Sequence, residues 1–312
     1  MKFMNSVTTK IVLGSLLFTG ANLQAQSDKT EKKLGPAESI THLTTSLAKN
    51  DVYQAWAFLP KSWRADINGI AHLIGQKMAS VVWDKAFVVM GRLGAVLDTK
   101  AQLFLDTTGG QLPPGVTKED ALASIKDVGN VFRMLSESKI STIQGLQTVD
   151  LGDVAEGTAS AILKRVFANN LINNIVMKES KGKVTSFENA LSKMTATLIS
   201  QSGDTAKITV VDPDGGSAEV NMTKVDGKWL TVSMAQDFIK KLPQLKQKLS
   251  IELDKFSSQG MMAAGLLVMA EGIITSLENA TTAEDLQKVF AGLPFKPMAI
   301  LGGGGKARAG EK

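Results

Sequence analysis

The segment from Met194 to Val232 alternates apolar and polar residues, and three turn signals interrupt the alternation. These signals are Ser202-Gly203-Asp204, the run 212–216 and Asp226-Gly227. Gly and Asp tolerate the positive φ that tight hairpin turns require, so each signal is expected to join two antiparallel neighbours. The segment therefore predicts a four-stranded antiparallel meander over about 194–232.

The turn at Asp226-Gly227 also predicts the register of the last hairpin. With two residues in that turn, Lys224 opposes Trp229. Trp229 then shares a face with Met222, whereas Leu230 points the other way. The last strand is thus apolar on both sides, and we expect helices to cover part of its outer face.

Outside this segment, apolar residues recur at helical spacing, which predicts a helix-dominated α+β fold with a C-terminal helical extension. The stretch 140–149 is compatible with a short strand or a loop. Gly69, Gly75, Gly91 and Gly94 lower the helix propensity, and they are expected to permit close helix–helix approach or to mark a break near 75–80. Pro243 means that its helix either begins there or kinks. Residues 261–277 are very apolar, but Glu271 and the length favour a buried helix over a membrane span.

The first 25 residues have the three-part pattern of a secretory signal peptide. Lys2 and Lys10 charge the leader, the apolar run 11–18 follows, and small residues come next. Cleavage is expected after Ala25, with Ala21 as the second choice. The apolar run is shorter than the roughly 20 residues that a membrane-spanning helix needs. The pattern therefore predicts a periplasmic or extracellular protein with no transmembrane span in the mature chain.

The mature chain is expected to divide into four parts. Residues 26–35 are a flexible lead-in, 36–232 an α+β domain, 233–300 a helical extension packed on it, and 301–312 a disordered tail.

Composition narrows the classes of protein and site. The chain has no cysteine, so it has neither disulfides nor thiolate metal sites, and a bacterial envelope protein fits better than a small animal secreted domain. Removing the leader leaves 33 Lys and Arg against 30 Asp and Glu, a net charge of +3, which gives nucleic-acid binding little electrostatic support. Aromatic residues make up 5% of the chain, so no aromatic-lined cofactor site is expected and no cofactor is predicted.

Motifs that would carry chemistry are incomplete. His42 and His72 are too few for a zinc site, and no Gly-x-Ser-x-Gly elbow accompanies them. The run 212–216 begins like a calcium loop, but Thr223 stands where the bidentate Glu should be. The run 302–306 lacks the strand and helix of a phosphate loop. We therefore predict no catalytic residue and no metal site. The cluster Lys240–Lys248 is interpreted as a solvated helix face, with anionic lipid or an acidic partner as the alternative.

Two short runs carry a family resemblance. Residues 47–56 (LAKNDVYQAW) resemble the opening helix pair of the nuclear transport factor two-like superfamily, and residues 224–229 (KVDGKW) are similar to its final hairpin. The resemblance implies a cystatin-like cone, in which a curved sheet wraps around a long helix and encloses a pocket. The two runs are separated by 167 residues, which are mainly helical in pattern up to the start of the predicted sheet.

These features together predict a non-enzymatic binding or interaction module of the cell envelope. The inner face of the sheet, with Trp229 at its end, would form either a filled core or a pocket for a small apolar ligand. The candidates to line that pocket are Tyr53, Trp56, Met222 and Trp229, and Tyr53 and Trp56 are equally candidates for plain core residues. An envelope protein is the other possible partner. The alternative is a structural or assembly protein whose C-terminal helices, Phe238–Phe290, pack on a partner or on a second copy. A hydrolase or isomerase that uses the cone is a third class, and it requires a buried carboxylate or histidine in a cleft.

Overall fold

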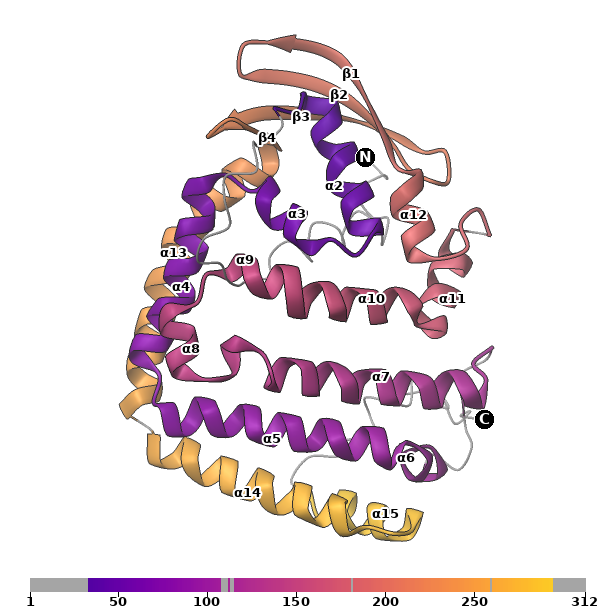
Figure 1. Ribbon diagram of the computed structural model, residues 1–312, viewed down its shortest axis with the longest axis vertical. Coiled ribbons are helices and arrows are strands. Elements are labelled where there is room, and N and C mark those ends of the chain that lie inside the picture. Colours follow the sequence, from indigo (N-terminus) through magenta and orange to yellow (C-terminus); the bar gives the residue numbers. More distant parts are fainter. Residues whose placement is uncertain (1–32, 108–111, 113–114, 181, 259, 294–312) are drawn as a thin grey trace, which may run out of the picture.

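The computed structural model describes residues 33–107, 112, 115–180, 182–258 and 260–293. The predicted leader and C-terminal tail lie outside these residues. Figure 1 shows one sheet at an end of the molecule, with helices arranged in successive rows beneath it. The predicted class is confirmed: the fold is helix-dominated α+β, with a single four-stranded antiparallel sheet among the described residues and helices after it.

The sheet has the predicted meander topology. Its strands follow chain order: β1 (Thr195–Ser202), β2 (Thr205–Val211), β3 (Ser217–Val225) and β4 (Lys228–Thr231). The predicted turn glycines Gly203, Gly215 and Gly227 all have positive φ, as tight turns demand. Lys224 pairs directly with Trp229, so the predicted register of the last hairpin is confirmed.

Helix α2 (Pro36–Ala48) covers the inner face of the sheet. Ala37 and Ile40 of this helix pack against a buried cluster on β2, β3 and β4. The members of that cluster are Ala206, Ile208, Met222 and Trp229. Leu230 points the opposite way and is fully buried among helices, as the apolar pattern of β4 predicts.

The helices nearest the sheet are α3 (Val52–Phe58), α9 (Leu151–Val154), α10 (Ser160–Ala168), α11 (Asn170–Glu179) and α12 (Phe187–Lys193). A single π-helical turn, Ala155–Ala159, lies between α9 and α10. Asp51 caps α3 by accepting a hydrogen bond from the backbone N–H of Gln54, as expected for a helix that begins at Val52. Leu43, Phe167, Phe187 and Leu191 belong to one buried cluster that joins α2, α10 and α12.

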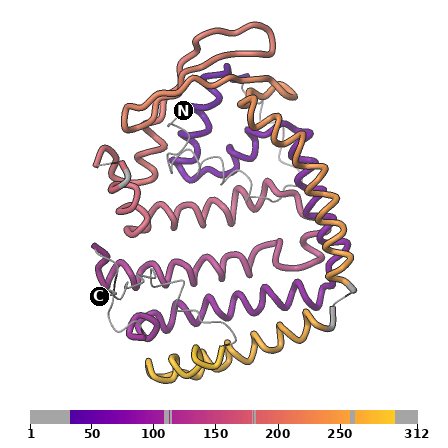
Figure 2. The backbone as a smooth tube through the Cα atoms, turned by 180° about the vertical axis from the view of Figure 1, so that it is seen from behind, coloured from indigo at the N-terminus to yellow at the C-terminus, as the bar shows by residue number. Residues whose placement is uncertain are grey.

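Two L-shaped helix pairs lie side by side and form the spine of the molecule (Figures 1 and 2). The first is α4 (Lys61–Lys77) with α5 (Ser80–Thr99), and the predicted break falls at Met78-Ala79. The second is α13 (Val232–Ser258) with α14 (Gly260–Asn279). Helix α13 runs alongside α4, and α14 alongside α5. The side-chain pairs that join them are Trp63 with Phe238, Lys77 with Asp254, Lys85 with Glu271 and Arg92 with Glu278.

Helix α13 begins directly after β4, and Pro243 lies inside it. Of the two expected alternatives, a helix that begins at Pro243 is therefore wrong, and α13 is one continuous element of 27 residues. The remaining elements are α6 (Ala101–Thr107), α7 (Lys118–Ser136), α8 (Ile143–Thr148) and α15 (Ala283–Ala291). The undecided stretch 140–149 is helical, since a 3₁₀ turn at Lys139–Ser141 precedes α8.

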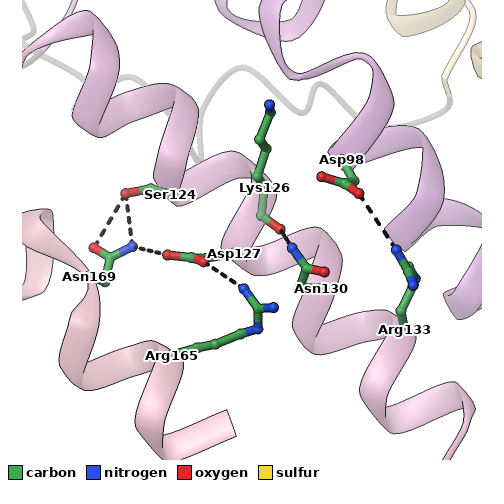
Figure 3. A network of polar contacts seen from close by, with 8 residues as sticks. All are labelled: Asp98, Ser124, Lys126, Asp127, Asn130, Arg133, Arg165 and Asn169. Atoms are coloured by element: carbon green, nitrogen blue, oxygen red, sulfur yellow. Dashed lines mark hydrogen bonds and ion pairs between the residues drawn. The ribbon is translucent and has the colours of Figure 1, made fainter. Parts of the chain in front are cut away.

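A polar seam joins α7 to α10 and α11 (Figure 3). Asn169 is the N-cap of α11, and its Nδ2 donates to Asp127 of α7 at 2.9 Å and to Ser124 at 3.2 Å. Asp127 also pairs with Arg165 at 3.3 Å. Because Asn169 is only 7% exposed, these hydrogen bonds satisfy an amide that water does not reach.

Candidate interaction surface

The four predicted pocket residues fall into two separate groups. Trp56 is buried, with Tyr53 beside it, in the cluster that contains Leu230. Met222 and Trp229 are buried in the cluster on the inner face of the sheet. Trp229 and Leu230 are consecutive residues of β4 whose side chains point in opposite directions, and each belongs to a different one of these two clusters. The four side chains therefore do not line a common pocket.

The inner face of the sheet is filled by protein side chains where the pocket was predicted. Met222 is 1% exposed and Trp229 is 2% exposed. The Lys224 ammonium lies 5.3 Å from the centre of the Trp229 ring, which is a cation–π contact. These residues act as core residues of the sheet.

The two histidines lie apart and have different surroundings. Nε2 of His72 lies 2.7 Å from the carbonyl oxygen of Val149, so this ring holds the junction between α8 and α9. His42 is exposed on α2. Among the described residues, no group of three or more His, Asp or Glu side chains is placed to hold a metal ion.

The largest departure from the sequence-based expectation is the outer face of α14. The helix was expected to be buried, and this is wrong for one of its faces. Ala263, Ile274 and Leu277 are buried, but the opposite face carries exposed apolar side chains. The exposed fractions are 66% for Met262, 58% for Leu266, 59% for Val268 and 46% for Met269.

This outer face is uncharged over about four helical turns. Gly265 and Gly272 lie on it, and a Cβ at either position would have no neighbour within 4 Å. Glu271, the acidic residue within this stretch, is turned away to pair with Lys85 of α5 at 2.8 Å. Contiguous exposed apolar surface of this kind marks interaction sites on soluble proteins.

The inner side of α14 is packed against α5 and α15. Ile274 and Leu277 pack with Val96 of α5 and Leu286 of α15. Arg92 donates two hydrogen bonds to the carboxylate of Glu278, at 2.5 Å and 2.9 Å. The hydrogen bond from Arg92 holds the pKa of Glu278 below its usual range.

The lysine cluster on α13 is a solvated helix face with local ion pairs. Lys241 pairs with Asp237 one turn earlier, and Lys246 with Asp66 of α4. Lys240 and Lys248 are exposed. Pairing with acids of the same chain reduces the positive charge that this face presents to an outside partner.

No family model, curated protein or solved structure matches this chain. The resemblance to the nuclear transport factor two-like superfamily thus stays a prediction. Within the described ranges, no single helix is long and apolar enough to cross a membrane, and only α13 and α14 taken together, with a 78° bend between them, meet that criterion.

Proposed function

We propose that this chain is an exported, non-enzymatic assembly protein of the bacterial envelope that pairs with a second copy through the outer face of α14. The observation that carries the proposal is the exposure of Met262, Leu266, Val268 and Met269 on one uncharged helix face. Export rests on the leader pattern of residues 1–25. Tyr53 and Trp229 belong to two separate, filled clusters. This favours assembly over the binding of a small apolar ligand between them.

The outer face of α14 can pack against the same face of a second copy, because its large and small residues are spaced to match. Gly265 and Gly272 are seven residues apart, which is about two helical turns. A two-fold axis between Val268 and Met269 would set Gly265 of one copy opposite Gly272 of the other in an antiparallel pair. The bulky side chains then meet at the centre, and the glycines allow the backbones to approach on either side. Because the face carries no charge, two copies meet without repulsion.

An interface centred on one helix is small, below the roughly 800 Å² per partner of a standard interface. We therefore expect a reversible dimer that dissociates on dilution. Sedimentation velocity of the purified chain, measured over a wide concentration range, tests this. A monomer–dimer equilibrium is expected, and a strict monomer at the highest concentration contradicts the proposal.

Charged substitutions on α14 test whether its outer face is the dimer interface. Leu266→Lys and Met269→Lys place charges at its centre and are expected to give monomers. Ile239→Lys is the matched control, because Ile239 is 67% exposed on α13, away from α14. Since the chain has no cysteine, Met269→Cys offers a second readout. A disulfide-linked dimer should form under mild oxidation, and failure to cross-link would contradict the antiparallel pairing.

A further inference from the structure

The chain carries its sulfur only in methionine. It has 13 methionines and no cysteine, so the thioether is the sole sulfur group that an oxidant can attack. Most of the methionines that the structure describes are buried or half-buried, and Met222 is only 1% exposed. The exposed ones among them are Met177 at 42%, Met262 at 66% and Met269 at 46%. A dissolved oxidant reaches exposed sulfur first, so these are the most reactive of the described methionines.

Two of the exposed methionines lie on the outer face of α14. Met262 and Met269 are seven residues apart with Leu266 between them, which is the i, i+4, i+7 spacing of one helical stripe. Met177 lies instead on α11, near the sheet (Figure 1). Methionine suits binding surfaces because its long, polarisable side chain adapts to a partner, and oxidation disrupts such surfaces. The proposed dimer face is therefore also the place where exposed thioethers gather.

We infer that Met262 and Met269 form an oxidation-sensitive modification site, and that their conversion to methionine sulfoxide by a peroxide dissociates the dimer. The inference rests on the proposed pairing of two copies through α14. The thioether sulfur attacks one oxygen of hydrogen peroxide, and an S–O bond forms as the O–O bond breaks. The proton of the transferred oxygen passes to the departing one, which leaves as water. Sulfur is oxidised by two electrons and the peroxide is reduced by two, so no further reactant is needed.

A sulfoxide oxygen finds no hydrogen-bond donor at the centre of the proposed interface. Met269 lies next to the two-fold axis, and its neighbours Leu266 and Val268 carry no donor in their side chains. Because Met269 lies well inside α14, the backbone N–H groups around it are bonded within the helix. In the monomer, water donates the missing hydrogen bond. Oxidation therefore favours the monomer over the dimer.

The expected effect is large because the dimer is symmetric. One unpaired buried polar group weakens an association about tenfold, and Met269 occurs twice in the dimer, so its full oxidation should raise the dimer dissociation constant about a hundredfold. The dimer in turn shields Met269 from peroxide. Oxidation of Met269 should therefore slow as the protein concentration rises, whereas oxidation of Met177 should not.

Sedimentation velocity before and after peroxide treatment tests the site. The full chain is treated with hydrogen peroxide, excess oxidant is removed, and sulfoxides are located by peptide mass spectrometry. The readout is the ratio of the dimer dissociation constants after and before treatment. This ratio should be about a hundred for the unaltered chain. It should not change in the double variant Met262→Leu/Met269→Leu, which keeps apolar side chains of similar volume and has no sulfur at these positions. Met177→Leu is the matched control, and its ratio should equal that of the unaltered chain.

Reduction of the sulfoxides separates a specific modification from general damage. Methionine sulfoxide reductases of both stereospecific types convert the sulfoxide back to the thioether, so their addition should restore the dimer, with circular dichroism unchanged throughout. A dimer that persists although Met262 and Met269 are fully oxidised would overturn the inference and leave the α14 pairing intact. Dissociation of the double variant by peroxide would also overturn it, because another residue would then be responsible. A chain that is monomeric before peroxide is added contradicts the pairing itself, and the inference with it.

Discussion

Gly94 of α5 and Gly129 of α7 pack backbone against backbone. A Cβ on Gly94 would lie 2.5 Å from the carbonyl oxygen of Gly129, and a Cβ on Gly129 would lie 2.6 Å from the carbonyl oxygen of Gly94. The relationship is reciprocal, so neither helix has room for a side chain at the crossing. The expected role of Gly94 in close helix approach is confirmed, and its partner is Gly129.

Alanine at either glycine should therefore destabilise the protein. The added methyl group meets a backbone carbonyl, which cannot rotate away, so the two helices must separate. We expect Gly94→Ala and Gly129→Ala each to lower the free energy of unfolding by about 1–3 kcal/mol, as overpacking usually does. Urea denaturation followed by circular dichroism measures the loss.

A glycine on the neighbouring helix provides a control of opposite sign. Gly69 of α4 has nothing within 4 Å of a built Cβ, so alanine gains helix propensity without a clash. Gly69→Ala should raise the free energy of unfolding by about 0.5–1 kcal/mol. Equal effects at Gly94 and Gly69 would mean that backbone entropy, and not the close crossing, decides both.

The stacked rings of Trp63 and Phe238 fasten α13 to α4. Their centroids lie 3.9 Å apart with an 11° angle between the planes, and the residues are far apart in sequence. Trp63 is 4% exposed, so Trp63→Ala should lower the free energy of unfolding by about 3–5 kcal/mol. Phe238→Leu keeps an apolar side chain and loses only the ring contact, for which about 1 kcal/mol is expected. If both variants lose the same amount, the rings are not in contact in solution.

Features that depend on a few neighbouring residues could be predicted from the sequence, whereas features that depend on how distant elements pack could not. The meander was predictable because Gly203, Gly215 and Gly227 determine their own turns, and neighbouring strands follow. The partner of Gly94 was not, since it depends on how α5 and α7 pack. The exposed face of α14 was missed for a related reason: Leu266 and Ile274 are equally apolar, and only the placement of α5 and α15 decides which one is buried.

The predicted pocket failed to assemble for a similar reason. Tyr53 and Trp56 were placed near Met222 and Trp229 without knowledge of which buried cluster α3 joins. The alternation of β4 did predict that Trp229 and Leu230 point to opposite sides. The structure adds that Trp56 of α3 belongs to the buried cluster of Leu230, whereas α2 packs on the cluster of Trp229.

The seam between α7 and α11 depends on the buried amide of Asn169. Asn169→Ala removes its hydrogen bonds to Ser124 and Asp127, and leaves the α11 N-terminus without its cap. We expect a loss of about 1–3 kcal/mol in the free energy of unfolding. Asn170→Ala is the matched control, because Asn170 makes an exposed hydrogen bond to Asp120 and should cost less. Comparable losses at both positions would show that burial of Asn169 adds nothing.

Acid should loosen α14 and α15 through two carboxylates. Hydrogen bonding from Arg92 lowers the pKa of Glu278, and hydrogen bonding from Thr282 lowers the pKa of Asp285. A carboxylate with a lowered pKa in the folded state contributes stability above its unfolded pKa, and this contribution is lost as the pH falls through the folded pKa. The free energy of unfolding should therefore decrease as the pH is lowered below the ordinary pKa range of glutamate. Faster amide exchange in α14 and α15, measured by mass spectrometry, is the expected sign of this loss. Glu278→Gln should make exchange in α14 less dependent on pH over that range. An unchanged pH profile in this variant would show that the Arg92–Glu278 pair does not couple α14 to α5 in solution.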